Sequence, residues 1–176
     1  MDLIINRRLT GMKTDNLRKQ LSEGLIKPGD VLDFPEEEQS WRVLDVNGNR
    51  AFLFCFRVKS PVEMAYNESG SNQYEGSDIQ KYLHEEFPNT APEALNDLRS
   101  GHYFLLSKEE VMEYMPREID RIVCDVSGRT YFWLTRSAYR GTANYTWNVA
   151  ASGYVSNANA GFAHRFAPAC GLYIDL

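Results

Sequence analysis

Two apolar runs with a short turn between them restrict the possible folds more than any other part of this sequence. Residues 41–46 and 51–58 are rich in aromatic and β-branched side chains, and Asn47-Gly48 separates them. Asn-Gly tolerates the positive φ angles of a tight hairpin, so the pattern predicts two antiparallel strands. Phenylalanines recur at a period of two in the second run, which predicts that one strand face directs them toward the core: Phe52, Phe54 and Phe56.

The rest of the first two thirds reads as short helices and strands. We expect a helix at 14–24, a strand at 31–34 and a buried strand at 103–106. Three further helices are expected to begin with capping boxes, at Ser77, Thr90 and Ser107, because each has Gln or Glu three residues later. A hydroxyl at such a position accepts a hydrogen bond from a free backbone N–H, and the Gln or Glu reaches back to the cap.

The last third has weaker patterning. Strands are expected at 119–126 and 129–136, around Ser127-Gly128, and at 172–176. No period holds between 137 and 168, so this stretch is expected to be a long irregular loop region, which in a compact domain is usually functional. Together these features predict an α+β fold with a hairpin-rich antiparallel sheet and short helices.

The chain has 176 residues, of which 43% are hydrophobic and 24% charged, and this composition is that of a globular protein. Its formal charge of −5 argues against a general nucleic-acid binder, which would be basic. No apolar run approaches the length of a membrane span. In residues 1–8 the apolar run Leu3-Ile4-Ile5 precedes the basic pair Arg7-Arg8, the reverse of a secretory signal, so we expect a cytoplasmic protein.

The charges are distributed unevenly along the chain. Residues 126–174 contain no Asp or Glu and four arginines, so this segment carries +4. Taking this +4 from the total of −5 leaves −9 on the other residues. The same segment is rich in Tyr, Trp, Asn, Ser and Gly, the composition of loops that bind other proteins. Arginine adds stacking and bidentate recognition of carboxylates.

We therefore expect a set of partner-binding residues in this segment. The set is Arg136, Tyr139, Arg140, Tyr145, Trp147, Tyr154, Asn157, Asn159, His164 and Arg165. The alternative is that many of the aromatic side chains fill the core, which is what we expect of Trp133. For His164 the alternative is an ordinary polar contact.

The sequence contains no recognisable catalytic or metal-binding pattern. Cys55, Cys124 and Cys170 form no CxxC motif and are interpreted as reduced, half-buried thiols. The three histidines are scattered, and His84, in an acidic helix, is expected to face solvent. Calcium prefers carboxylate oxygens, which residues 126–174 lack. We expect no catalytic residues, no metal and no cofactor.

Several segments together resemble a family of bacterial and phage domains of unknown function with a C-type-lectin-like fold. They are residues 41–46, 76–83 with Phe87, 104–111, 133–137, 147–149, 153–155 and the closing Pro168-Ala169. The resemblance covers residues 25–176 and implies one domain there, preceded by an N-terminal helical extension at 1–24. The family usually has an arginine directly before the closing Pro-Ala. Here Ala167 occupies that position, and Arg165 lies two residues earlier.

The resemblance implies further properties. This fold is similar to those of formylglycine-generating enzymes and of phage receptor-binding proteins, with adjacent N- and C-terminal strands and ligand contacts on long loops. We expect a non-catalytic protein-binding module encoded by a phage or mobile element, binding a protein partner. A narrower alternative is a cytoplasmic inhibitor of a host defence nuclease, of the anti-CRISPR type. A third is an oxidase like the formylglycine-generating enzymes, which bind copper through a cysteine pair; Cys124 and Cys170, 46 residues apart, do not reproduce that pair. A further alternative is a structural or surface component of a virion.

Overall fold

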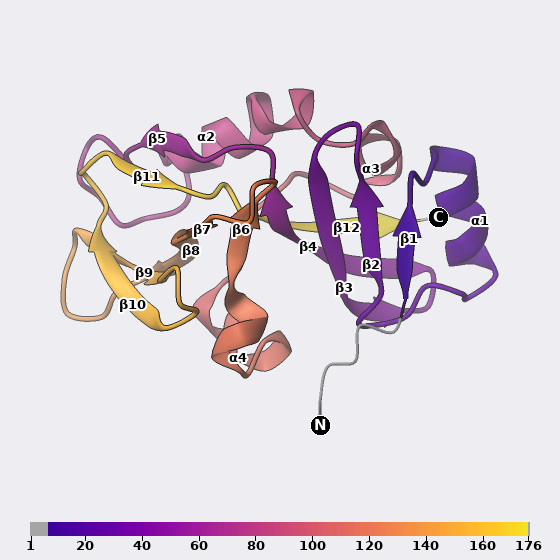
Figure 1. Cartoon of the computed structure of the whole chain (residues 1–176). Coiled ribbons are helices and arrows are strands. Elements are labelled where there is room, and N and C mark those ends of the chain that lie inside the picture. Colours follow the sequence, from indigo (N-terminus) through magenta and orange to yellow (C-terminus); the bar gives the residue numbers. More distant parts are fainter. Residues whose placement is uncertain (1–6, 176) are drawn as a thin grey trace.

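The computed structural model describes residues 7–175 and contains one large sheet, two small ones and several short helices (Figure 1). The α+β class is confirmed. The large sheet has the order β1-β2-β3-β4-β6-β7, and β12 also pairs with β4. Its strands are β1 (Arg8–Thr10), β2 (Val31–Phe34), β3 (Gln39–Asn47), β4 (Arg50–Val58), β6 (Val123–Asp125), β7 (Thr130–Tyr131) and β12 (Gly171–Asp175). Its pairs are antiparallel except for β1 with β2 and β4 with β6.

The hairpin predicted at 41–58 is confirmed as β3 and β4. Asn47 pairs with Arg50, so the two turn residues are Gly48 and Asn49, one position later than predicted. The prediction that β4 has a single buried face is incomplete, because residues 51–55 are all buried. Phe52 stacks on Tyr173, while Phe56 is half-buried beneath the Arg42 guanidinium. β4 lies between β3 and β12 and is covered on both faces, so its burial does not alternate.

Two small sheets lie at the end of the molecule opposite α1 (Figure 1). One has the order β10-β9-β8, and the other pairs β5 with β11. Their strands are β8 (Trp133–Ala138), β9 (Tyr145–Val149), β10 (Val155–Asn159), β5 (Val62–Met64) and β11 (His164–Phe166). The prediction of a long irregular loop region at 137–168 is therefore wrong, since this stretch contains β9, β10 and β11. These strands are short and rich in small and polar residues, so their period is hard to recognise, and their pairing depends on β8 and β5.

The helices are short and lie mostly around the large sheet. They are α1 (Thr14–Ser22), α2 (Asp78–Glu85), α3 (Glu93–Leu98), α4 (Lys108–Tyr114) and the 3₁₀ helices η1 (Phe87–Asn89) and η2 (Glu118–Arg121). The helix predicted at 14–24 is confirmed. η2 occupies the start of the strand expected at 119–126, although the β6–β7 hairpin that follows is confirmed. The strand expected at 103–106 is reduced to one isolated bridge, between Phe104 and Gly171.

The three predicted capping boxes have different outcomes. Ser107 and Glu110 form the complete box at the start of α4. Ser77 caps α2 by accepting from the Gln80 N–H, but the Gln80 side chain accepts from Gly76 instead of the cap. Thr90 is not the N-cap of α3, which begins later with Pro92 as its N-cap; it is the C-cap of η1 instead, and its hydroxyl donates to the Phe87 carbonyl.

Residues 7–24 pack against the rest of the described chain. β1 pairs with β2, and α1 places Leu17 and Leu21 in the same core cluster as the large sheet. β2, β3 and β4 separate β1 from β12, so the first and last described strands are not adjacent, in contrast to what the resemblance implies. None of the helices between residues 7 and 175 combines the length and apolar character that a membrane crossing needs.

Candidate functional site

One face of the three-stranded sheet gathers five of the residues predicted to bind a partner. In β9 and β10, Tyr145 lies opposite Asn159 and Trp147 opposite Asn157. Directly opposite residues share a face, so these four side chains lie together. Thr146, between Tyr145 and Trp147, is buried on the other face, which packs against the body. Tyr139 completes the set by donating its N–H to the Tyr145 carbonyl, 2.8 Å away.

Trp147 is the centre of this surface. Its ring centroid lies 4.6 Å from that of Tyr139. The Lys108 ammonium, at the start of α4, lies 3.9 Å from the centroid of the Trp147 ring. Such a cation–π contact holds the indole in place while leaving it half-buried. We call the surface formed by Lys108, Tyr139, Tyr145, Trp147, Asn157 and Asn159 the outer face.

Arg140 and Tyr154 lie in turns at opposite ends of β9. Arg140 is exposed in the turn before the strand, and Tyr154, 61% exposed, lies in the turn after it. The second turn sits against η2, because the Arg121 guanidinium donates to the Gly153 carbonyl. Ile119 of η2, 69% exposed, therefore belongs to the same end of the molecule as Tyr154. Sequence reasoning missed Ile119, which was expected in a strand.

Arg136 is held within the protein. Its guanidinium donates to both carboxylate oxygens of Glu110, each 2.8 Å away, and to the Leu105 carbonyl. It also lies over the Phe104 ring. These contacts fasten β8 to α4 and use most of its hydrogen-bonding capacity. Arg136 therefore has a structural role, and we leave it out of the outer face.

His164 and Arg165 belong to a different ribbon. Both are on β11, where His164 pairs with Met64 and Arg165 lies opposite Glu63 of β5. The His164 Nε2 lies 3.3 Å from the Asn159 carbonyl oxygen, and its ring packs against the edge of Phe132. His164 thus makes the ordinary polar contact given as its alternative. Trp133 is fully buried, as expected.

The fold brings together two cysteines that lie far apart along the chain. The Cys55 N–H donates to the Cys170 carbonyl at 2.9 Å, and both side chains are buried. Burial raises the pKa of both thiols far above the ordinary range, so they are neutral at pH 7. Cys124 is half-buried, and all three cysteines are free. Their separation of 115 residues conceals the contact of Cys55 with Cys170 in the sequence.

Two histidines also meet unexpectedly. His84 of α2 stacks on His102, with ring centroids 4.0 Å apart. His84 is half-buried instead of facing solvent freely, and burial followed by the charge of His102 lowers its pKa. Within residues 7–175, no three or more His, Cys, Asp and Glu side chains cluster in a way that could hold a metal ion.

The outer face combines aromatic side chains, amide groups and one cation, whereas Arg136, which was predicted to belong with them, is held by Glu110. Comparisons of this chain with protein-family models, with curated proteins and with solved structures found no match.

Proposed function

We propose that this protein is a non-catalytic binding protein that contacts a protein partner through the outer face. The observation that carries the proposal is the half-exposed Trp147, held between Tyr139 and Lys108 and bordered by two asparagines. Interface energy concentrates in such aromatic anchors, which are surrounded by polar groups that exclude water. A pre-positioned indole loses little conformational freedom on binding.

The charge of the surface suggests the kind of partner. Residues 126–174 carry no carboxylate, and Lys108 and the exposed Arg140 add positive charge around the aromatic side chains. An acidic protein surface would complement them and accelerate association. The net charge of −5 on the whole chain opposes binding to nucleic acid.

Origin and host role belong to the same proposal. The resemblance to bacterial and phage C-type-lectin-like domains supports a phage or mobile-element protein. In that setting an inhibitor of a host defence nuclease, acting in the host cytoplasm, is a specific version of the same binding function. Recovery of a defence nuclease from host lysate would favour this version, and its absence among the captured proteins would count against it.

The test compares two doubly substituted proteins as bait in host lysate. Arg140→Ala with Trp147→Ala removes one cation and one aromatic anchor from the outer face. Arg18→Ala with Leu25→Ala removes an exposed cation and an exposed apolar side chain from the opposite end. We expect capture of the specific partner, quantified by mass spectrometry, to fall at least about tenfold for the first protein only.

A substitution that preserves the packing of Trp147 separates binding from folding. Asn157 is exposed beside Trp147, so Asn157→Glu adds a negative charge without removing a core contact. We expect this change also to weaken capture while the unfolding midpoint stays near that of the wild type. Equal capture by wild type and both outer-face proteins, all folded, would refute the proposal.

A second candidate is an oxidase resembling formylglycine-generating enzymes, which the contact between Cys55 and Cys170 favours. Copper(I) prefers thiolate ligands, but these two thiols are buried and neutral. We therefore expect no stoichiometric copper(I) binding by the purified protein. One bound equivalent that is lost in Cys170→Ser and retained in Cys124→Ser would favour the oxidase over the binding protein.

A further inference from the structure

A row of polar residues crosses one face of the large sheet, far from the outer face in the fold. In register across β1, β2, β3 and β4 lie Thr10, Asp33, Ser40 and Arg57. Directly opposite residues point to the same side of a sheet, so this row forms a polar strip near one end of the strands. In Figure 1 the ribbons of β1, β2 and β3 are seen with no helix in front of them.

The strip forms one wall of a cleft of about 360 Å³. Pro35 and Glu38, in the turn between β2 and β3, line it on one side, and Val126, just after β6, lines it on the other. Val126 is 48% exposed and contributes an apolar side chain to the cleft. Glu38 has a φ of +57°, a left-handed conformation that side-chain-bearing residues rarely adopt and that is often found at functional sites.

The acidic group of the strip is already engaged. Asp33 accepts hydrogen bonds from the Arg8 Nε at 2.7 Å, the Arg8 Nη2 at 3.0 Å and the Ser40 hydroxyl at 2.6 Å. Desolvation raises the pKa of Asp33, but these hydrogen bonds and the charges of Arg8 and Arg57 outweigh it, so the pKa lies below its usual range. Asp33 and Arg8 therefore form a neutralised pair.

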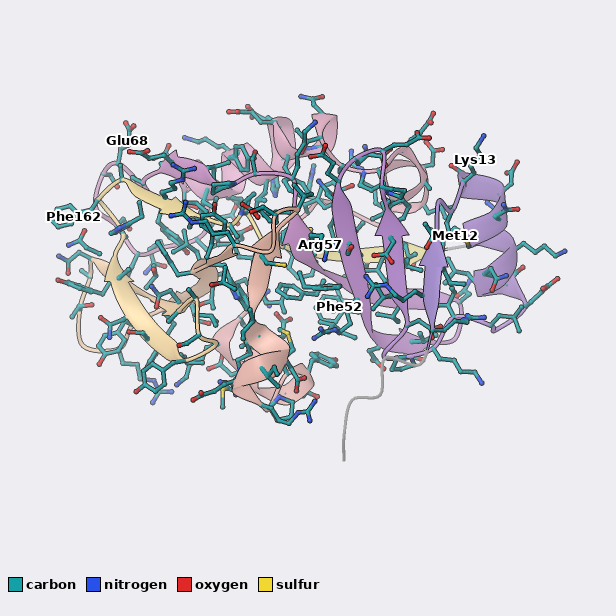
Figure 2. The ribbon with its side chains drawn as sticks, in the orientation of Figure 1. Met12, Lys13, Phe52, Arg57, Glu68 and Phe162 are labelled. Carbon is teal, nitrogen blue, oxygen red and sulfur yellow. The ribbon has the colours of Figure 1, made fainter. Side chains whose placement is uncertain are left out.

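Arg57, unlike Arg8, is not paired with a carboxylate by hydrogen bonds within the described residues. Its Nε is buried and has no hydrogen-bond partner within the described part of the chain. Its guanidinium interacts with Asp33 only through space, because Arg8 and Ser40 occupy the oxygens of that carboxylate. Arg57 also lines the cleft, and its two Nη groups, which make no hydrogen bond within the described residues, are the donors that a ligand in the cleft can reach. Figure 2 shows Arg57 near the end of β4, next to β6.

We propose that this cleft binds a carboxylate group attached to an apolar body, with the carboxylate on the Arg57 guanidinium and the apolar part against Pro35 and Val126. The two Nη groups of the planar guanidinium can donate parallel hydrogen bonds to the two oxygens of a carboxylate. Arg8 is paired with Asp33, which leaves Arg57 as the cation that a ligand can use, and inorganic phosphate has no apolar part to lie against Pro35 and Val126. This site is independent of the outer face.

Such a carboxylate can come from a free organic acid or from the C-terminus of another protein. The test titrates ¹⁵N-labelled protein with 4-methylpentanoate, with its neutral amide, with inorganic phosphate and with N-acetylleucine as a mimic of a chain end. We expect saturable shifts of backbone amides at 34, 36–40, 57 and 126 with the two carboxylates, and at least about tenfold weaker binding of the amide and of phosphate. Tighter binding of N-acetylleucine identifies a chain end as the source, and tighter binding of 4-methylpentanoate identifies a small acid.

Substitutions assign the effect to the guanidinium. Arg57→Gln should weaken 4-methylpentanoate binding at least about tenfold, and Arg57→Lys, which keeps the charge but loses the fork, should have an intermediate effect. Arg18→Gln, an exposed arginine on α1, is the matched control and should bind like the wild type. The Arg57 side chain makes no hydrogen bond within residues 7–175, so the fold should survive its replacement. Binding by Arg57→Gln equal to wild type, no saturable shift, or equal affinity for phosphate or the amide would overturn the proposal.

Discussion

Gly153 is a residue whose identity is dictated by close approach of the backbone. It has a φ of +90°, and a Cβ there would lie 1.9 Å from the Glu118 carbonyl oxygen. We expect Gly153→Ala to lower the free energy of unfolding by about 3 kcal/mol, because conformational strain and a clash with a fixed backbone add together. Urea denaturation of the two proteins measures this difference.

Gly141 supplies the control for that substitution. Its φ of +84° is nearly the same, but a Cβ there would have nothing within 4 Å. Gly141→Ala should therefore lose only the conformational part, about 1–2 kcal/mol. Equal losses at the two positions would show that the turn after β9 shifts away from η2 freely. No pattern in the sequence signals the contact, because Glu118 lies 35 residues before Gly153.

Among the helices and strands, the sequence predicts those whose turns or ends are determined by neighbouring residues. The β3–β4 hairpin depends on Gly48, the start of α4 on Ser107 and Glu110, and the β6–β7 hairpin on a turn at Ser127-Gly128, and all three are present. Strands β9, β10 and β11 were missed, because each is completed by a partner strand instead of by its own alternation. Their small and polar residues satisfy backbone hydrogen bonds only once β8 and β5 are in place.

For the candidate site, too, the sequence indicates the segment but not which of its side chains face outward. The absence of carboxylates from residues 126–174 singles out the segment that contains most of the outer-face residues. It could not separate Trp147, which faces outward, from Arg136, which Glu110 draws inward. The choice depends on α4, a distant element in the sequence that supplies both Glu110 and the Lys108 cation. The polar strip at Arg57 was missed for a similar reason, since its four residues come from four strands.

For the whole molecule, the question is whether residues before 25 are an extension or part of one cooperative unit. Leu17 of α1 is fully buried in the core cluster that includes β4 and β12. The Thr14 hydroxyl donates to Asp97 of α3 at 2.6 Å, and Arg8 pairs with Asp33 across β1 and β2. These contacts join the segment to α3, to β2 and to the shared core. One cooperative unit should follow from them, because a small domain with a shared core unfolds in a single transition.

Leu17→Ala tests this unity against Leu25→Ala, a chemically identical change at a side chain that is 41% exposed. Removing the buried side chain should cost about 2–4 kcal/mol of unfolding free energy, and removing the exposed one less than about 1 kcal/mol. If the core is shared, the slowest-exchanging amides of β4 and β12 should lose protection in Leu17→Ala by the same free energy as the urea transition. A loss confined to α1 and β1, with β12 unchanged, would instead make residues 7–24 a separately melting extension, because only a shared core transmits a cavity in α1 to a strand at the other end of the chain.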